Sequence, residues 1–158
     1  AHLRPYRAGP ALTEIVDSRL SSVFPQVRLL PIMAFYDLVA NKVPDRFPDL
    51  RIGFIETNSS WVPFVFHYLN RRTKSGRSAW GPHIFRDYRL YVACEVDEDL
   101  PYILGHVGED NMITGSDYGH TDQSTEPGLF ELMRTREDLS PETINKIVSH
   151  NPARFYSL

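Results

Sequence analysis

Three short apolar runs, each ending in polar or acidic residues, punctuate the chain from residue 51 onward. They cover residues 51–56, 89–95 and 111–115, and their length and composition are typical of buried strands. Around them, apolar residues recur every three or four positions, which predicts amphipathic helices. The expected helices cover residues 31–42 and 97–107, with further helices in 12–20, from about residue 61 and from residue 141.

The elements expected from residue 51 onward follow the order strand, helix, strand, helix, strand, helix. Such alternation implies βαβ units with right-handed crossovers and a parallel sheet. We therefore predict an α/β fold, with residues 1–158 forming a single domain.

Polar residues and prolines indicate where several elements begin and end. Ser59 or Ser60 is the expected cap of the helix that follows the first strand, and Ser140 is the expected cap of the last helix. Residues 45–47, between two prolines, are expected to be irregular, and residues 73–82 to form a loop. The apolar faces expected for the two capped helices are Trp61, Val65, Tyr68 and Leu69, and Ile144, Ile147 and Val148.

The composition is that of an ordinary globular domain, with 42% hydrophobic and 23% charged residues. A formal net charge of -3 and a pI near 6.1 do not indicate the positive charge that binding to nucleic acid or acidic lipid requires. No stretch approaches the ~18 apolar residues of a membrane span, and the start lacks a signal-peptide pattern. Cys94 is the only cysteine, which excludes an internal disulfide, and within its apolar run we interpret it as packing. We expect a reducing, cytoplasmic compartment.

Acidic residues stand at the carboxyl ends of the three expected strands: Glu56, Glu95 and Asp117. In parallel α/β architectures, ligands bind and catalysis occurs at this edge. Polar residues also occur there simply because the chain leaves the core. For Glu95, which precedes the acidic run 97–99, we favour that simpler interpretation.

Three further motifs follow one another along the chain. They are residues 47–52 (FPDLRI), running into Glu56 and 61–63 (WVP); residues 108–120, with Gly-Ser-Asp-Tyr at 115–118; and residues 151–156 (NPARFY). In this order they resemble the sixth-strand region, the eighth-strand motif and the end of the last helix of the amidohydrolase-2 group, which includes aminocarboxymuconate semialdehyde decarboxylase and its relatives. The resemblance implies the C-terminal half of a TIM-like (β/α)8 barrel, about strands 5 to 8 with their helices.

The resemblance also implies a mononuclear divalent metal, usually zinc, with manganese as the alternative. In the family the eighth-strand aspartate binds the metal and handles a proton, a role that falls on Asp117 here. A strand-end carboxylate can hold such a cation and accept a proton from its bound water; a turn or helix cap is the other interpretation. His2 stands about as far before Glu56 as the family's fifth-strand histidine ligand does. Otherwise His2 is a terminal residue or a tag remnant.

Two features depart from the family's pattern. Many relatives have His-Gly-Gly-Gly after the sixth strand, where this chain has residues 56–60 (ETNSS), which puts the decarboxylase mechanism in doubt. Glu56 either orients a ligand or substrate or pairs with an arginine. The family's first-strand metal ligands also have no counterpart, and a complete barrel has about 250 residues. A half barrel has two open strand edges, so a missing N-terminal half or another copy of the chain is expected to cover them.

These features favour a metal-dependent hydrolase that acts on a small organic substrate by attack of metal-activated water. Asp117 and His2 would bind the metal, Glu56 and His120 are the other catalytic candidates, and Trp61 and Tyr118 would shape the substrate pocket. Two alternatives stay open. One is a lyase, a non-oxidative decarboxylase on the same scaffold, and the other is a non-catalytic partial barrel that binds a partner through its open edges.

Overall fold

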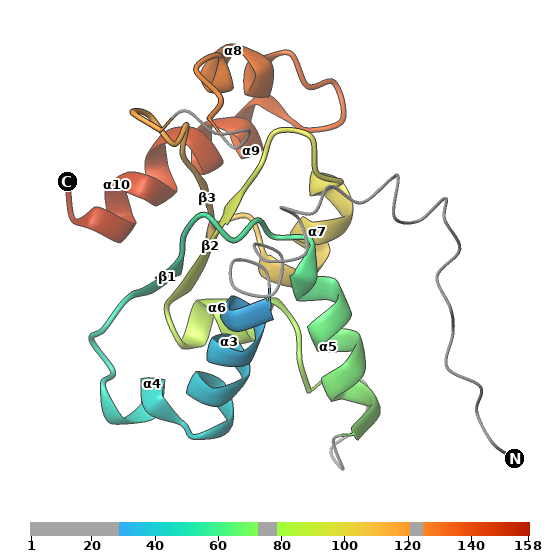
Figure 1. The fold of residues 1–158 in the computed structure, drawn as a ribbon, viewed down its shortest axis with the longest axis vertical. Helices are drawn as coiled ribbons and strands as arrows, with labels where there is room; N and C mark the ends of the chain where they lie inside the picture. Colours follow the sequence, from blue (N-terminus) through green and yellow to red (C-terminus); the bar gives the residue numbers. More distant parts are fainter. Residues whose placement is uncertain (1–28, 73–78, 121–124) are drawn as a thin grey trace, which may run out of the picture.

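The computed structural model describes residues 29–72, 79–120 and 125–158 (Figure 1). No helix among these residues has both the length and the apolar character needed to cross a membrane. The expected helix within 12–20 lies outside the described residues. The described elements are α3 Leu30–Ala40, α4 Val43–Arg46, β1 Ile52–Phe54, α5 Trp61–Arg72, α6 Pro82–Asp87, β2 Leu90–Cys94, α7 Leu100–Val107, β3 Met112–Thr114, α8 Leu129–Arg134, α9 Pro141–Asn145, the π-helical turn η2 Lys146–His150, and α10 Asn151–Tyr156.

The three strands form one parallel sheet in the order β1-β2-β3, as the alternation of elements predicts. Ile52 of β1 pairs with Leu90 of β2, and Val92 of β2 pairs with Met112 of β3. The middle strand, β2, is buried along its whole length. Because all three strands run the same way, the segments that follow them meet at one edge of the sheet. Parallel strands alternating with helices are the arrangement of part of a (β/α) barrel.

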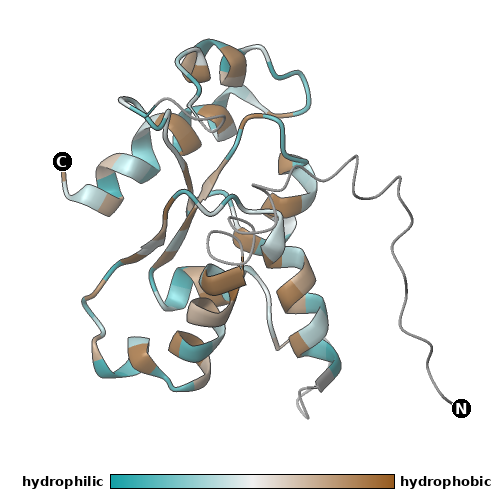
Figure 2. Ribbon diagram, in the orientation of Figure 1, coloured by the Kyte–Doolittle hydropathy of each residue, from teal (hydrophilic) through white to brown (hydrophobic). Residues whose placement is uncertain are grey.

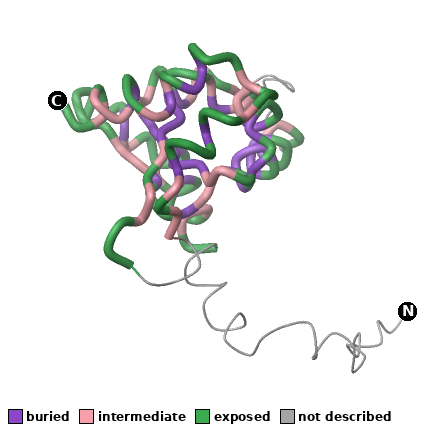
Figure 3. The backbone as a smooth tube through the Cα atoms, turned by 90° about the horizontal axis from the view of Figure 1, so that it is seen from above, coloured by how far each residue is buried: buried purple, intermediate pink, exposed green. Residues whose placement is uncertain are grey.

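The main hydrophobic core lies between one face of the sheet and helices α3, α5, α6 and α7 (Figures 1 and 2). Phe35 of α3 is fully buried at its centre, and its ring lies 5.2–5.8 Å from the rings of Phe54, Trp61, Phe66 and Phe85. Aromatic pairs at such separations contribute beyond the area that they bury. Figure 3 shows the buried segments gathered in the interior of the described part. This core fixes the positions from which the strand ends emerge.

The opposite face of the sheet carries a smaller apolar cluster of Tyr91, Ala93 and Ile113. Helix α10 lies on this side, away from α5 and α7 (Figure 1), and places Phe155 against Tyr91 with ring centroids 5.0 Å apart. A Cβ atom added to Gly53 of β1 would come within 2.6 Å of Cζ of Phe155. The absence of a side chain at residue 53 therefore lets the aromatic ring lie directly on the strand.

Several helices differ from the sequence-based expectations. The segment expected to be irregular is partly helical, because Pro44 lies in the first turn of α4, where a missing N–H costs nothing. Of the expected loop 73–82, residues 73–78 lie outside the described residues, and Pro82 already begins α6. Neither α6 nor α8 had been anticipated. Gly81 and Gly128 precede these helices and make no side-chain capping bond, so Pro82 in the first turn was the available start signal for α6. On α5, Trp61, Val65 and Leu69 are buried as expected, whereas Tyr68 is 48% exposed and Val62 and Phe66 complete the buried face.

The two serines before α5 do not act as simple caps. The hydroxyl groups of Ser59 and Ser60 both donate to the carboxylate of Glu98, at 2.7 and 2.5 Å. By contrast Ser140 caps α9 as expected, because its Oγ accepts a hydrogen bond from the Thr143 N–H at 3.1 Å. Helix α7 is capped in the same way by Asp99. The start of α5 is thus held by a residue from the segment that follows β2.

Candidate functional site

Three side chains with metal-binding atoms meet at the carboxyl edge of the sheet. They are Glu56 from the segment after β1, and Asp117 and His120 from the segment after β3. One ligand atom of each lies within 4.8 Å of those of the other two. Two candidates predicted from the strand ends and one from the following turn therefore lie together in the structure.

A tight turn brings His120 back over Asp117. Asp117 has φ of 52° and Gly119 has φ of 98°, so the backbone passes twice through the left-handed region. The His120 N–H donates to the Asp117 carbonyl at 3.2 Å, and the Glu126 N–H donates to the Ser116 carbonyl at 3.0 Å. As a result, Nδ1 of His120 lies 2.8 Å from Oδ1 of Asp117.

Asp117 and His120 differ strongly in exposure. The Asp117 side chain is 10% exposed, whereas that of His120 is 60% exposed. The carboxylate is therefore largely enclosed, and the imidazole faces solvent on its outer side. This arrangement suits a carboxylate that binds inside the site and an imidazole that exchanges protons with water.

The Glu56 side chain projects from a loop with an unusual backbone. Glu56 and Asn58 have φ of 58° and 49°, which costs on the order of 1–3 kcal/mol for each such residue. The Thr57 hydroxyl donates to the Phe54 carbonyl at 3.3 Å, and the Trp61 indole N–H donates to the Asn58 carbonyl at 3.0 Å. Such a conformation persists where neighbouring contacts fix it, and these two bonds are part of that support.

A cavity of about 120 Å³ adjoins these residues. Its walls include the carboxylates of Glu56, Glu95 and Asp117, the apolar side chains of Ala93 and Ile113 from the second face of the sheet, and Tyr156 from α10. The lining thus combines acidic and apolar residues. Such a cavity can hold a cation beside a small organic group.

Cys94 also borders the cavity, but the residue is only 3% exposed and belongs to the main core. Burial, and to a smaller extent the nearby negative charge of Glu98, raises the pKa of Cys94 to about 12. A thiol with such a pKa stays protonated at neutral pH and is a poor nucleophile. The interpretation of Cys94 as a packing residue is therefore confirmed by its burial.

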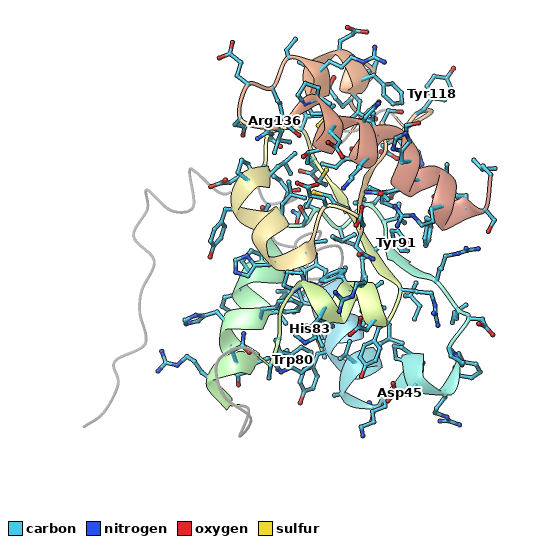
Figure 4. The ribbon with its side chains drawn as sticks, turned by 180° about the vertical axis from the view of Figure 1, so that it is seen from behind. Asp45, Trp80, His83, Tyr91, Tyr118 and Arg136 are labelled. Atoms are coloured by element: carbon cyan, nitrogen blue, oxygen red, sulfur yellow. The ribbon has the colours of Figure 1, made fainter. Side chains whose placement is uncertain are left out.

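The two aromatic residues expected to shape the pocket lie elsewhere. Trp61 is 7% exposed and packs in the main core against Phe35 and Phe54. Its position at the start of α5 directs the indole inward rather than toward the cavity. Tyr118 is 94% exposed and lies at the outer margin of the molecule (Figure 4). Neither residue is among those that line the cavity. His2 lies outside the described residues.

Two cavity residues were not anticipated as such. Glu95, interpreted from sequence as a plain strand exit, lines the cavity together with Glu56 and Asp117. The position of Glu95 at a strand end was the sequence signal that could have identified it. Tyr156 comes from the last helix, α10, and nothing in the sequence pattern indicates that α10 packs on the sheet face of Tyr91, Ala93 and Ile113. The tertiary fold places Tyr156 beside the cavity.

The donor set fits a divalent metal. Two ligand atoms of one zinc ion, each about 2.0–2.2 Å from it, are separated by less than about 4.4 Å. The ligand atoms of Glu56, Asp117 and His120 lie within 4.8 Å of one another, so small side-chain movements suffice to bring them to one ion. Carboxylate oxygen and imidazole nitrogen are ligands that zinc and manganese accept.

The family model described as Amidohydrolase matches residues 27–158. The chain belongs to the amidohydrolase family. Members of this family generally depend on a divalent metal, which agrees with the donor set at the strand ends. A comparison with curated proteins found no match.

Among solved structures, the chain is similar to the amidohydrolase map2389c from Mycobacterium avium subsp. paratuberculosis K-10. The TM-score is 0.62 at 22% sequence identity, and the match covers 76% of this chain. The match covers 31% of the chain of map2389c, so the present chain spans about a third of that relative's length. At this identity the similarity shows the fold, which is that of part of an amidohydrolase barrel.

Proposed function

We propose that this chain provides part of the active site of a metal-dependent hydrolase, with a divalent cation, zinc or manganese, bound against Asp117. The observation that supports this is the meeting of Glu56, Asp117 and His120 at the carboxyl edge of the parallel sheet, beside an acidic cavity. When bound, such a metal lowers the pKa of a coordinated water toward neutrality and so supplies a nucleophile. The substrate is a small organic molecule of carboxylate, ester or lactone type.

The residues of this chain have distinct tasks in that proposal. Asp117 binds through its enclosed carboxylate and accepts a proton at an Oδ atom. His120, whose Nδ1 lies 2.8 Å from Asp117 Oδ1, holds that carboxylate in place and passes the proton to solvent from its exposed side. Glu56 contributes a second carboxylate, and the apolar residues Ala93 and Ile113, which line the cavity, exclude water from the substrate. His2 remains a proposed further ligand, from outside the described residues.

The motifs shared with the aminocarboxymuconate semialdehyde decarboxylase group support a narrower placement within the family. We propose that the chain corresponds to the C-terminal half of such a barrel, about strands 5 to 8. A decarboxylase would use the same cation to hold a substrate carboxylate. The presence of Glu56, where many of those relatives have a histidine, favours hydrolysis. The single cysteine supports a reducing, cytoplasmic setting.

A non-catalytic role is the alternative from another class. Among the described residues, the outer strands β1 and β3 each pair with β2 alone. Open edges of this kind recruit a further strand or a partner chain. A scaffold that binds through these edges would not need a metal, so metal content separates it from the enzyme.

The deciding experiment compares the metal content of the wild-type chain with that of Asp117→Asn. Each protein is loaded with Zn²⁺ or Mn²⁺, dialysed, and analysed by mass spectrometry for bound metal. We expect about one equivalent of bound metal in the wild type and at least tenfold less bound metal in the variant. Asp45→Asn is the matched control, because Asp45 is exposed on α4, at the opposite end of the molecule from Tyr118 (Figure 4). Equal metal content in all three proteins would contradict the proposal.

A further inference from the structure

The carboxylate of Glu98 makes an unusual set of contacts for a residue outside the metal-binding group. It accepts hydrogen bonds from the backbone N–H groups of Ser59, Ser60 and Glu95, at 2.9, 2.6 and 2.9 Å. The hydroxyl groups of the two serines donate to it as well, and the residue is only 9% exposed. A buried charge is expensive unless donors satisfy it, and here five groups do so.

These contacts join the segment after β1 to the segment after β2, beyond the residues at which the two strands pair. Ser59 and Ser60 follow β1 and lead into α5, while Glu95 directly follows β2. The carboxylate also lies at the N-terminus of the 12-residue helix α5, where backbone N–H groups and the helix dipole favour a negative charge. Glu98 therefore fastens the first strand's exit loop to the end of the second strand.

The fastened loop is the one that carries Glu56. Only two residues separate Glu56 from Ser59, and the backbone between them passes twice through the left-handed region, at Glu56 and Asn58. Since that conformation is intrinsically unfavourable, contacts at both ends of the loop are needed to maintain it. On the other side Glu98 holds the backbone of Glu95, whose side chain lines the same cavity.

A second interaction keeps Glu98 itself in place. The Arg136 guanidinium donates through Nη1 to the Val96 and Glu98 carbonyls, at 2.6 and 3.0 Å, and its Nη2 pairs with Asp138 at 2.5 Å. The Glu98 backbone is thereby anchored to the segment between α8 and α9. The carboxylate thus reaches the serines from a fixed position.

From this geometry we propose that Glu98 is the positioning residue of the site: it holds the Glu56 loop in the conformation in which Glu56 meets Asp117 and His120. The inference rests on the proposed function for its link to metal binding. The positioning of the loop itself does not depend on a metal. A replacement of Glu98 should release the loop and weaken the metal site without touching a ligand.

The test uses the full chain and the variant Glu98→Gln, which keeps the size of the side chain. The Gln amide offers one acceptor oxygen, and its NH₂ faces N–H and O–H donors, so several of the five bonds are lost. We expect Mn²⁺ affinity to fall about tenfold or more, within the range typical of residues that orient metal ligands. Amide hydrogen exchange at residues 56–60 should rise selectively in the same variant, measured without metal.

Two further variants separate positioning from general stability. Ile147→Val removes a buried methyl group from η2, away from the cavity, and serves as a control of comparable destabilisation. Glu98→Asp keeps the charge but shortens the reach, and should restore part of the metal affinity. If Glu98→Gln and Ile147→Val lower the melting temperature alike and leave Mn²⁺ affinity equal, Glu98 is only a structural cap and the proposal is overturned.

Failure of the proposed function gives a different result. If the wild-type chain binds no Mn²⁺ or Zn²⁺, the metal site is wrong, and hydrogen exchange alone decides the role of Glu98. Faster exchange confined to residues 56–60 then supports positioning of the loop. Faster exchange spread evenly over the described helices and strands overturns it.

Discussion

Nδ1 of His120 lies 2.8 Å from Oδ1 of Asp117, three residues earlier in the same turn. The pair joins an enclosed carboxylate to an exposed imidazole, and it leaves the other ring nitrogen of His120 outside this contact. In metal sites, a hydrogen bond of this kind fixes the orientation of a ligand and tunes its basicity. The relationship therefore gives His120 a definite task even if it does not bind the metal itself.

Replacing this imidazole should weaken the site without abolishing it. For His120→Gln we expect Mn²⁺ affinity to fall by about 10- to 100-fold, since Asp117 loses the group that orients it. Isothermal titration calorimetry measures the change. His67→Gln is the matched control, because His67 is an exposed histidine on α5. An affinity for His120→Gln equal to that of the control would remove His120 from the site.

Cys94 should be unreactive in the folded protein. Burial raises its pKa to about 12, so almost none of the thiolate that reacts with alkylating agents is present at pH 8. We expect iodoacetamide to label the chain only in urea, where the thiol returns to its ordinary pKa. Mass spectrometry of native and unfolded protein after equal exposure measures the difference. Rapid native labelling would show that the cavity opens at residue 94.

The same pKa shift makes stability depend on alkaline pH. Below about pH 9 the thiol is protonated in both the folded and unfolded states, and it contributes no slope. Between about pH 9 and 12 the unfolded chain loses the proton while the folded chain retains it, so the free energy of unfolding falls as pH rises. Cys94→Ala should show a shallower fall over that range in urea titrations. Identical slopes for the two proteins would contradict the raised pKa.

The sequence was sufficient to predict the parallel sheet and the edge at which its strand ends meet. Apolar runs bounded by polar residues locate β1, β2 and β3, and parallel pairing requires their exits to meet at one edge. Asp117 and Glu56 could be assigned to that edge because each directly follows a strand. His120 was identified from the same eighth-strand motif. Local pattern and topology agree at these positions.

Other features depend on contacts that no local pattern encodes. Glu98 is one of three consecutive acidic residues, and only the packing of two loops distinguishes it from its exposed neighbours Asp97 and Asp99. Trp61 was placed both on the apolar face of α5 and in the substrate pocket, and its packing against Phe35 and Phe54 puts it in the core. Helices α6 and α8 follow glycines without capping side chains, so Pro82 in the first turn of α6 is the start signal that the sequence offers there. Tertiary packing decided the burial of Glu98 and Trp61.

Gly53 should not tolerate a side chain. In Gly53→Ala, the new Cβ would lie 2.6 Å from Cζ of Phe155, so α10 has to shift away from the sheet. We expect a loss of about 1–3 kcal/mol in the free energy of unfolding. Denaturant titration measures it, and Phe155→Leu in the same chain should recover part of the loss.

Gly105→Ala is the control for that substitution. A Cβ at residue 105 of α7 meets nothing within 4 Å, and alanine favours a helix over glycine by about 0.5–1 kcal/mol. This variant should therefore be slightly more stable than the wild type. If Gly53→Ala behaved like Gly105→Ala, Phe155 would not rest on β1.

Asn151 should be one of the most sensitive polar residues of the chain. It is fully buried, and its Nδ2 donates to the carbonyls of Glu109 and Met112, at 2.6 and 2.7 Å. These bonds connect the start of α10 to the start of β3, the strand that leads to Asp117. Asn151→Ala leaves the buried Met112 carbonyl and the partly buried Glu109 carbonyl without this donor, at a cost of about 1–3 kcal/mol in the free energy of unfolding. Urea titration measures the loss.

The substitution Asn151→Asp sharpens this prediction, because it preserves the shape of the side chain. A carboxylate has no N–H to donate and would place negative charge against two carbonyl oxygens. It should therefore destabilise the protein more than Asn151→Ala does, and the difference should shrink at low pH, where a protonated carboxyl group donates again. Asn145→Ala, at an exposed position of α9, should stay within about 0.5 kcal/mol of the wild type. An Asp variant as stable as the Ala variant at neutral pH would show that the two carbonyls do not depend on this donor.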